Sequence, residues 1–259
     1  MHKHFADAKS APHNGQVEPN VSKLIKSWGF HPHEELAGGH CSQVYADFER
    51  VLKVPFQGEE MSTGFLASKA LAGGLGPAVY NGDPSTGIIL MERLNPATKL
   101  GDSELTDAES LAVTCDLIKG FPIHQIEGMM ELSDFVNLDD PLAEQLINST
   151  QERRFLHGDL HPENILRHGD RWIVIDPKGL VGDPAFEPTA FLRNPLDVIP
   201  FLPNLREVFL HRIESFASAL QLDAWRICAW SLVDIRESKD SEWALVVEVL
   251  ESLEKELRH

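Results

Sequence analysis

The sequence predicts an α+β protein in two parts, a small β-rich N-terminal lobe and a larger, mainly α-helical C-terminal lobe. Short β-prone runs separated by turns dominate the chain as far as Glu92, whereas helical stripes dominate it from Thr106 onward. With 259 residues, 42% of them hydrophobic, the chain can bury a sizeable core. The predicted units are a flexible lead-in at residues 1–20, an N-lobe at 21–94 and a C-lobe at 95–259.

The predicted N-lobe opens with a helix at residues 21–28 and continues with two β-prone runs at 44–48 and 51–54. The loop before these runs, Gly38 to Ser42, contains two glycines and predicts the entry to a hairpin. Its backbone N–H groups could hold a phosphate, and Ser42 is predicted to contact a nucleotide there. By itself, a Gly-Gly pair indicates only a turn.

Lys53 lies inside an apolar run, where a buried ammonium group requires an anionic partner or ligand. A helix is predicted at residues 58–72, with Glu59 and Glu60 in its first turn, the end of a helix that favours acidic side chains. Either glutamate could pair with Lys53, and the alternative is a lysine that points to solvent. Two further strands are predicted at residues 78–80 and 88–92, joined by a turn at 81–84.

The predicted C-lobe consists of helices whose starts are marked by capping residues. Thr106 and Glu109 form a capping-box pattern, and Asp140-Pro141 puts an acid at an N-cap and proline at the first helical position. Further helices are predicted from apolar stripes at residues 205–220 and 243–257, and from a nearly all-apolar, buried segment at 227–235.

Composition excludes several classes of function. With 40 acidic against 23 basic residues, the formal net charge of -17 disfavours nucleic-acid and anionic-membrane surfaces and suits a neutral or cationic small molecule. The excess of acid is also explained by solubility alone. Three dispersed cysteines provide neither a disulfide framework nor a CxxC metal site. Because no signal peptide and no apolar run of about 18 residues is found, we expect a soluble cytoplasmic protein.

The chemistry is concentrated in the stretch HGDLHPEN, residues 157–164, which is followed by Asp176 after a predicted strand-turn-strand ending at residues 172–175. Phosphoryl transfer requires a proton acceptor for an alcohol and cations across the phosphates, and little covalent chemistry. Asp159 suits the acceptor role, while Asn164 and Asp176 offer oxygen ligands for Mg²⁺. Lys53 would hold the phosphates from the other lobe.

A rival interpretation uses His157, Asp159 and His161 as the ligands of a metal hydrolase. Neither HExxH nor CxxC supports it, and it leaves Asn164 and Asp176 without a role. These residues could also be purely structural. Under the phosphotransfer interpretation, the two histidines brace the loop by hydrogen bonding and do not take part in the chemistry.

Four segments resemble the aminoglycoside and hydroxyurea antibiotic resistance kinases, the streptomycin 6-phosphotransferase-like group within the protein-kinase-like fold. They are ILMERL at residues 89–94, HGDLHPENIL at 157–166, VIDPKGLVGDPAF at 174–186 and the stretch at 210–230. The resemblance covers roughly residues 36–245. It implies a protein-kinase-like α+β fold in two lobes, with ATP and Mg²⁺ as cofactors.

Residue by residue, the resemblance implies that Asp159 is the catalytic base and that Asn164 and Asp176 hold Mg²⁺. It also implies nucleotide contacts, from Lys53 to the α and β phosphates with Glu60 (or Glu59) as its partner, and from the backbones of Glu92 and Leu94 to adenine. The chain departs from related patterns at Asp176-Pro177-Lys178, where protein kinases have Asp-Phe-Gly, and at Glu187-Pro188, where an Asp-Leu pair is common.

The predicted function is therefore ATP-dependent phosphorylation of a hydroxyl group on an aminoglycoside-like, streptomycin-like small molecule. The alternatives are a kinase of another hydroxylated metabolite and a non-catalytic nucleotide-binding or regulatory protein. A polycationic acceptor would require carboxylates around the site, although a solvated surface role is the commoner one for such residues. The candidates are Asp197, Asp234, Glu237, Asp240 and Glu242.

Overall fold

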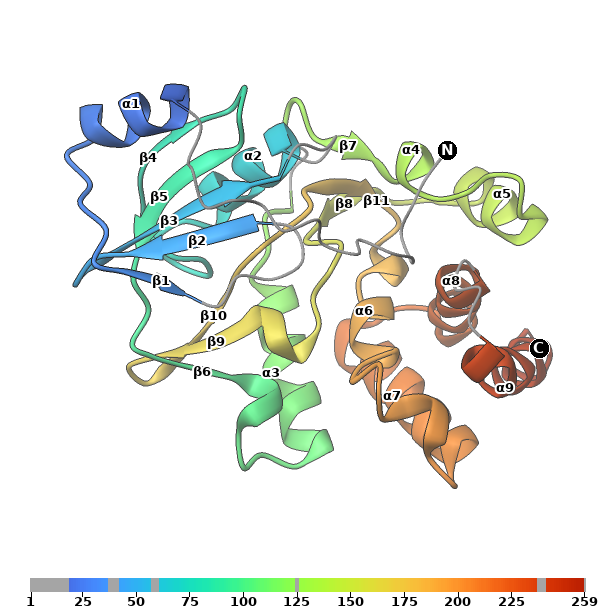
Figure 1. The fold of residues 1–259 in the computed structure, drawn as a ribbon. Coiled ribbons are helices and arrows are strands. Elements are labelled where there is room, and N and C mark those ends of the chain that lie inside the picture. Colours follow the sequence, from blue (N-terminus) through green and yellow to red (C-terminus); the bar gives the residue numbers. More distant parts are fainter. Residues whose placement is uncertain (1–18, 37–41, 57–60, 124–125, 237–240, 259) are drawn as a thin grey trace.

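The computed structural model describes residues 19–36, 42–56, 61–123, 126–236 and 241–258. A five-stranded antiparallel sheet, in the order β1-β2-β3-β5-β4, forms the N-terminal part of the structure (Figure 1). Its strands are β1 Glu34–Leu36, β2 Ser42–Ala46, β3 Arg50–Pro55, β4 Val79–Asp83 and β5 Ile88–Glu92. The predicted β2-β3 hairpin is confirmed, with Lys53 paired to Val44.

Two helices pack on this sheet. On one face, Ile25 of α1 (Pro19–Ser27) packs with Leu52 and Leu90 in a small core. The opposite face carries Lys53, because side chains alternate along a strand and Lys53 follows Leu52. Helix α2 (Met61–Leu71) lies over that face, since Gly82 there is pressed against the Phe65 ring. The predicted first turn with Glu59 and Glu60 lies outside the described residues.

The turn predicted at residues 81–84 is wrong, because the structure places it at residues 84–87. Asn81, Gly82 and Asp83 continue β4, which contains a bulge near Val79, and the chain turns afterwards. Asp83 fixes this later turn, because its side chain accepts from Ser85 N at 2.9 Å and its carbonyl from Gly87 N at 2.8 Å. Gly87 has a φ of 67°, a conformation that glycine adopts readily.

Two small three-stranded sheets surround the motif. One has the order β10-β9-β6, and the other has the order β7-β11-β8. Their strands are β6 Pro96–Lys99, β7 Met130–Glu131, β8 Arg154–Leu156, β9 Ile165–His168, β10 Arg171–Val174 and β11 Leu180–Gly182. The predicted strand-turn-strand is β9-β10, ending one residue before the predicted Ile175. Strands β6, β7, β8 and β11 were not predicted, because runs of two to four residues show no periodic pattern.

The C-terminal part is helical and holds the largest core of the described residues (Figure 1). Its helices are α3 Asp107–Lys119, α4 Leu132–Phe135, α5 Pro141–Asn148, α6 Thr189–Leu192, α7 Leu205–Leu220, α8 Ala224–Arg236 and α9 Ala244–Leu257. The capping box at Thr106 and Glu109 and the Asp140 N-cap are confirmed. Helix α8 is buried along most of its length, as predicted. In the described ranges, no helix is both long and apolar enough to span a membrane.

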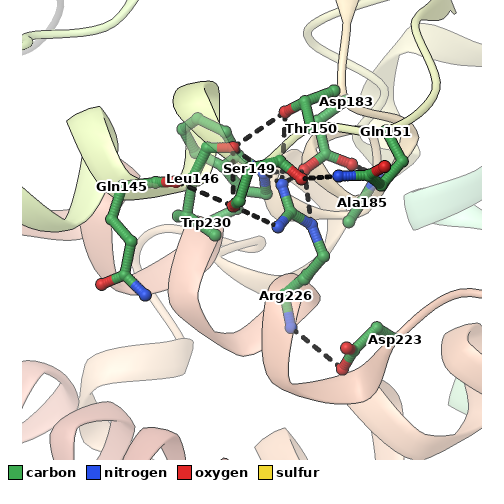
Figure 2. Close-up of polar contacts among 10 residues, drawn as sticks. All are labelled: Gln145, Leu146, Ser149, Thr150, Gln151, Asp183, Ala185, Asp223, Arg226 and Trp230. Carbon is green, nitrogen blue, oxygen red and sulfur yellow. Dashed lines mark hydrogen bonds and ion pairs between the residues drawn. The ribbon is translucent and has the colours of Figure 1, made fainter.

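Arg226 of α8 connects three separate segments of this part (Figure 2). Its Nε donates to Asp183 Oδ2 at 2.8 Å, and its Nη atoms donate to Ser149 Oγ and Leu146 O, each at 2.8 Å. Trp230 Nε1 donates to the same Asp183 oxygen at 2.8 Å. The network therefore joins α8 to the end of α5 and to the segment just after β11.

Candidate active site

The motif loop begins where β8 ends, and His157 is its buried anchor. His157 Nε2 donates to Ile175 O at 2.8 Å, and its Nδ1 accepts from Asp159 N at 3.3 Å. Burial lowers the pKa of His157 to about 4, so the ring is neutral at neutral pH. The predicted bracing role is thus confirmed for His157. Nδ1 of His161 does not brace the loop, because it is buried and makes no hydrogen bond to any described residue.

Asp159 lies between positive charges. Its Oδ1 accepts from Arg193 Nη2 at 3.0 Å, and Lys178 Nζ lies 3.8 Å from Oδ2. Burial acts to raise the pKa of Asp159, but the positive charges of Lys178 and Arg193 outweigh it, so the pKa is below its usual value. Asp159 is therefore a carboxylate at neutral pH, the form that can accept a proton.

Asn164 and Asp176 are brought together by the β9-β10 hairpin. Asn164 ends a short 3-10 turn, Pro162–Asn164, and its Nδ2 donates to Asp159 O at 2.9 Å. The backbone carbonyl of Asn164 accepts from Ile175 N at 2.9 Å, which places Asn164 next to the residue before Asp176. Asp176 has a φ of 59°, unusual for a residue other than glycine and often seen at functional sites.

Lys53 reaches the same place from the five-stranded sheet. Its Nζ lies 2.8 Å from Asp176 Oδ1, so the anionic partner that its apolar strand requires is Asp176. The predicted pairing with Glu60 or Glu59 lies outside the described residues. The Lys53 side chain is 21% exposed and that of Asp176 41% exposed, so this ion pair contributes little to stability. It does place an ammonium group beside the motif.

The oxygen atoms of this cluster suit a hard divalent cation. Because Asn164 uses its amide nitrogen on Asp159 O, its Oδ1 could serve as a neutral ligand together with the Asp176 carboxylate. The rival hydrolase site is not supported. Both ring nitrogens of His157 are committed to backbone partners. Within the described residues, no group of three His, Cys, Asp or Glu residues is arranged to hold a metal ion.

The predicted nucleotide contacts outside this cluster lie along the five-stranded sheet. Ser42 is buried at the start of β2, Glu92 ends β5, and Leu94 is buried just after it. Glu92 N donates to Ala78 O at 2.8 Å, so this N–H group is already used within the protein. These three contacts stay predictions, as does the phosphate-binding loop at residues 38–41, which lies outside the described ranges.

Three residues around the motif loop were not among the predicted site residues. Arg193, the residue just after α6, contacts Asp159, and Glu187 lies beneath the motif loop, where its Oε2 accepts from Gly158 N at 3.3 Å. Lys178 was recognisable from its place two residues after Asp176. Arg193 was not recognisable from the sequence, because only the packing of the neighbouring helix α6 brings it to the motif.

The three candidate acceptor carboxylates that the structure describes differ in their surroundings. Asp197 and Glu242 are exposed, in line with the solvated role, whereas Glu237 and Asp240 lie outside the described residues. Asp234 departs from that role, because its side chain is only 15% exposed and its Oδ2 accepts from Arg193 Nη1 at 3.0 Å. Asp234 is thus part of the cluster around Asp159.

Comparison with known proteins agrees with the motifs. The family model described as aminoglycoside/hydroxyurea antibiotic resistance kinase matches residues 130–244. Streptomycin 6-kinase of Streptomyces griseus is 24% identical over 84% of this chain and 80% of its own length. The enzyme of the same name from Streptomyces glaucescens is 26% identical over 82% of this chain and 78% of its own.

Among solved structures, the streptomycin-ATP-APH(2")-IIa ternary complex superposes with a TM-score of 0.57. It covers 93% of this chain and 98% of the other, at 16% sequence identity, a likeness that bears on the fold alone. The predicted resemblance to this kinase group is therefore confirmed, as is the protein-kinase-like α+β fold.

Proposed function

Starting from this resemblance, we propose that the protein is an ATP-dependent kinase that phosphorylates a hydroxyl group of an aminoglycoside-like small molecule. The similar streptomycin kinases indicate a phosphotransferase that acts on an alcohol group. The observation that carries the proposal is the convergence of Asp159, Asn164, Asp176 and Lys53. Segments separated by more than 100 residues meet here, with Lys53 2.8 Å from Asp176. Phosphoryl transfer requires this combination of base, cation ligands and ammonium group.

In the proposed mechanism, the Asp159 carboxylate accepts the proton of the acceptor hydroxyl as that oxygen attacks the γ-phosphoryl group. Lys53 binds the α and β phosphates of ATP and gives up its ion pair with Asp176 to do so. Asn164 and Asp176 would hold Mg²⁺, which neutralises phosphate charge when bound. The neutral His157 keeps the loop in place and takes no part in proton transfer.

The proposed arrangement assigns residues 21–94 to the nucleotide and residues 95–259 to the base, the cation ligands and the acceptor. ATP is supported by its presence in the similar ternary complex, which contains streptomycin and ATP. A streptomycin-like acceptor is supported by the names of the two similar enzymes. Such a reaction belongs in the cytoplasm, where ATP is available. A kinase of another hydroxylated metabolite is the alternative.

The decisive experiment is an acceptor screen with ATP and Mg²⁺, read by mass spectrometry as the addition of one phosphoryl group. We expect streptomycin or a related aminoglycoside to be modified. Asp159→Asn should lower kcat by at least about a hundredfold, the scale of lost general-base catalysis, while ATP binding is kept. The isosteric amide keeps the Asp159 backbone contacts, and retained ATP binding serves as the control for folding.

A different outcome would support the non-catalytic class. If ATP and Mg²⁺ raise the melting temperature but no acceptor in the panel is phosphorylated, the protein binds nucleotide without transferring phosphate. If Asp159→Asn turns over at the wild-type rate, Asp159 is not the base.

A further inference from the structure

Arg193 connects two acidic side chains at the centre of the candidate site. Its Nη2 donates to Asp159 Oδ1 at 3.0 Å, and its Nη1 donates to Asp234 Oδ2 at 3.0 Å. The side chains of Arg193 and Asp234 are 14% and 15% exposed, so little solvent competes for this contact. Charge-assisted hydrogen bonds of this type are directional and strong when partly buried.

The backbone that carries Arg193 is itself held in place. Arg212 of α7 donates from Nη1 to the carbonyls of Phe191, Leu192 and Asn194, at 3.1–3.3 Å. Its other nitrogens pair with Asp107 of α3, at 3.1 and 2.6 Å. Arg212 is buried and therefore fixes the carbonyls on both sides of Arg193. The position of the Arg193 guanidinium group is thus set by α3 and α7 as well as by α6.

These contacts make the two oxygens of Asp159 unequal. Oδ1 is bound to Arg193, whereas Oδ2 faces Lys178 Nζ at 3.8 Å, too far for a hydrogen bond. A general base needs one oxygen free to receive the proton and a carboxylate plane held at a fixed angle. Oδ2 is the oxygen that can receive the proton. The hydrogen bond from Arg193 to Oδ1 holds the carboxylate plane at a fixed angle.

We infer that Arg193 is a positioning residue, which holds Asp159 through Oδ1 so that Oδ2 receives the proton of the acceptor hydroxyl. Asp234 holds the other end of the Arg193 guanidinium group, since its hydrogen bond with Nη1 keeps the guanidinium plane from rotating away from Asp159. The inference rests on the proposed function. It adds to that function the side from which the acceptor hydroxyl approaches Asp159, which is the side of Lys178.

The test compares Arg193→Lys and Arg193→Gln with the wild-type enzyme, on an acceptor that the wild-type enzyme phosphorylates. Lysine keeps the charge but cannot bind two acids side by side, and glutamine loses the charge. We expect kcat to fall by up to about a hundredfold in both, the cost of misplacing a reacting group by about 1 Å. The KM for ATP should stay within about twofold, because Arg193 does not contact the nucleotide in the proposed mechanism.

Chemical rescue separates positioning from a merely structural role. Guanidinium ion added to Arg193→Ala should restore part of kcat, whereas an unfolded or distorted site would not respond. Arg206→Gln is the matched control, since Arg206 is an exposed arginine paired with Glu256, and it should leave kcat unchanged. Asp234→Asn provides a second variant if Arg193→Gln does not fold, and we expect a smaller fall in kcat with the KM for ATP unchanged.

The outcomes separate the two proposals. If no acceptor is phosphorylated by the wild-type enzyme, the proposed function fails and this inference falls with it. If the wild-type enzyme is active but folded Arg193→Lys and Arg193→Gln keep its kcat, only the inference on Arg193 is overturned. Loss of kcat without guanidinium rescue, accompanied by a rise in the KM for ATP, would also overturn it.

Discussion

At the scale of single residues, Glu187 is the most perturbed carboxyl group beneath the motif loop. It is 2% exposed, and its Oε2 accepts from Gly158 N at 3.3 Å. Burial raises its pKa from the usual 4.5 to about 8, so it is protonated at neutral pH. A neutral acid here avoids a second negative charge next to Asp159.

This shift makes folding stability depend on pH in a defined direction. Between pH 4.5 and about 8 the folded protein keeps the Glu187 proton that the unfolded chain releases. The contribution of Glu187 to the free energy of unfolding is therefore greatest below pH 4.5 and is lost as pH rises towards 8.

We predict that Glu187→Gln removes this contribution to the pH dependence. Glutamine is a neutral mimic of the protonated acid. The free energy of unfolding of the variant should therefore rise relative to that of the wild-type protein as pH increases from 5 to 8, by on the order of a few kcal/mol. Urea unfolding at several pH values measures the difference. A difference in unfolding free energy that stays constant from pH 5 to 8 would contradict the neutral state of Glu187.

At the scale of elements, Arg226 determines how α8 sits against α5 and β11 (Figure 2). Its partner Asp183 is 5% exposed and also accepts from Ala185 N at 3.0 Å, which starts the short 3-10 turn Pro184–Phe186. Removing one member of such a buried pair leaves the other charge without compensation. The segment between β11 and α6, which carries Glu187, depends on this anchor.

We predict that Arg226→Gln lowers the free energy of unfolding by about 3–5 kcal/mol. The matched change Arg206→Gln breaks a surface ion pair with Glu256 and should cost less than about 1 kcal/mol. Denaturant unfolding of both variants gives the comparison. Equal losses in the two variants would mean that the Arg226 network contributes no more than a surface pair.

At the scale of the whole molecule, helix α2, which packs on the five-stranded sheet, contacts the segment after Asp176 directly. Thr63 Oγ1 of α2 donates to Lys178 O at 2.7 Å. Gly179 has a φ of 76°, and a Cβ there would lie 2.4 Å from Thr63 O. The absence of a side chain at Gly179 thus permits the approach that brings Lys53 to Asp176.

Gly179→Ala tests this contact, with Gly169→Ala as its control. Gly169 also has a positive φ, 55°, but no atom lies within 4 Å of the Cβ it would gain. Backbone strain alone should cost each variant about 1–2 kcal/mol of stability. We expect Gly179→Ala to lose more than that and to bind ATP more weakly, measured by calorimetry, whereas Gly169→Ala should bind ATP normally.

The candidate site was predictable where its residues are close in sequence. Asp159 and Asn164 share one loop, and Asp176 follows after a hairpin whose length is fixed by two short strands. The start of α3 was predictable for the same reason, because a capping box is a contact between residues three apart. By contrast, β6 and β11 are too short for a period to show, and they exist through pairing with distant strands.

The sequence by itself determined the order of β-rich and helical parts, the helix caps and the residue types of the motif, because these depend on local pattern and spacing. Only the tertiary structure decided that Lys53 pairs with Asp176, and that Arg193 links Asp159 to Asp234. Those contacts join residues far apart in the chain with no fixed spacing. They arise where α2 packs on the segment after Asp176 and α6 packs on α8.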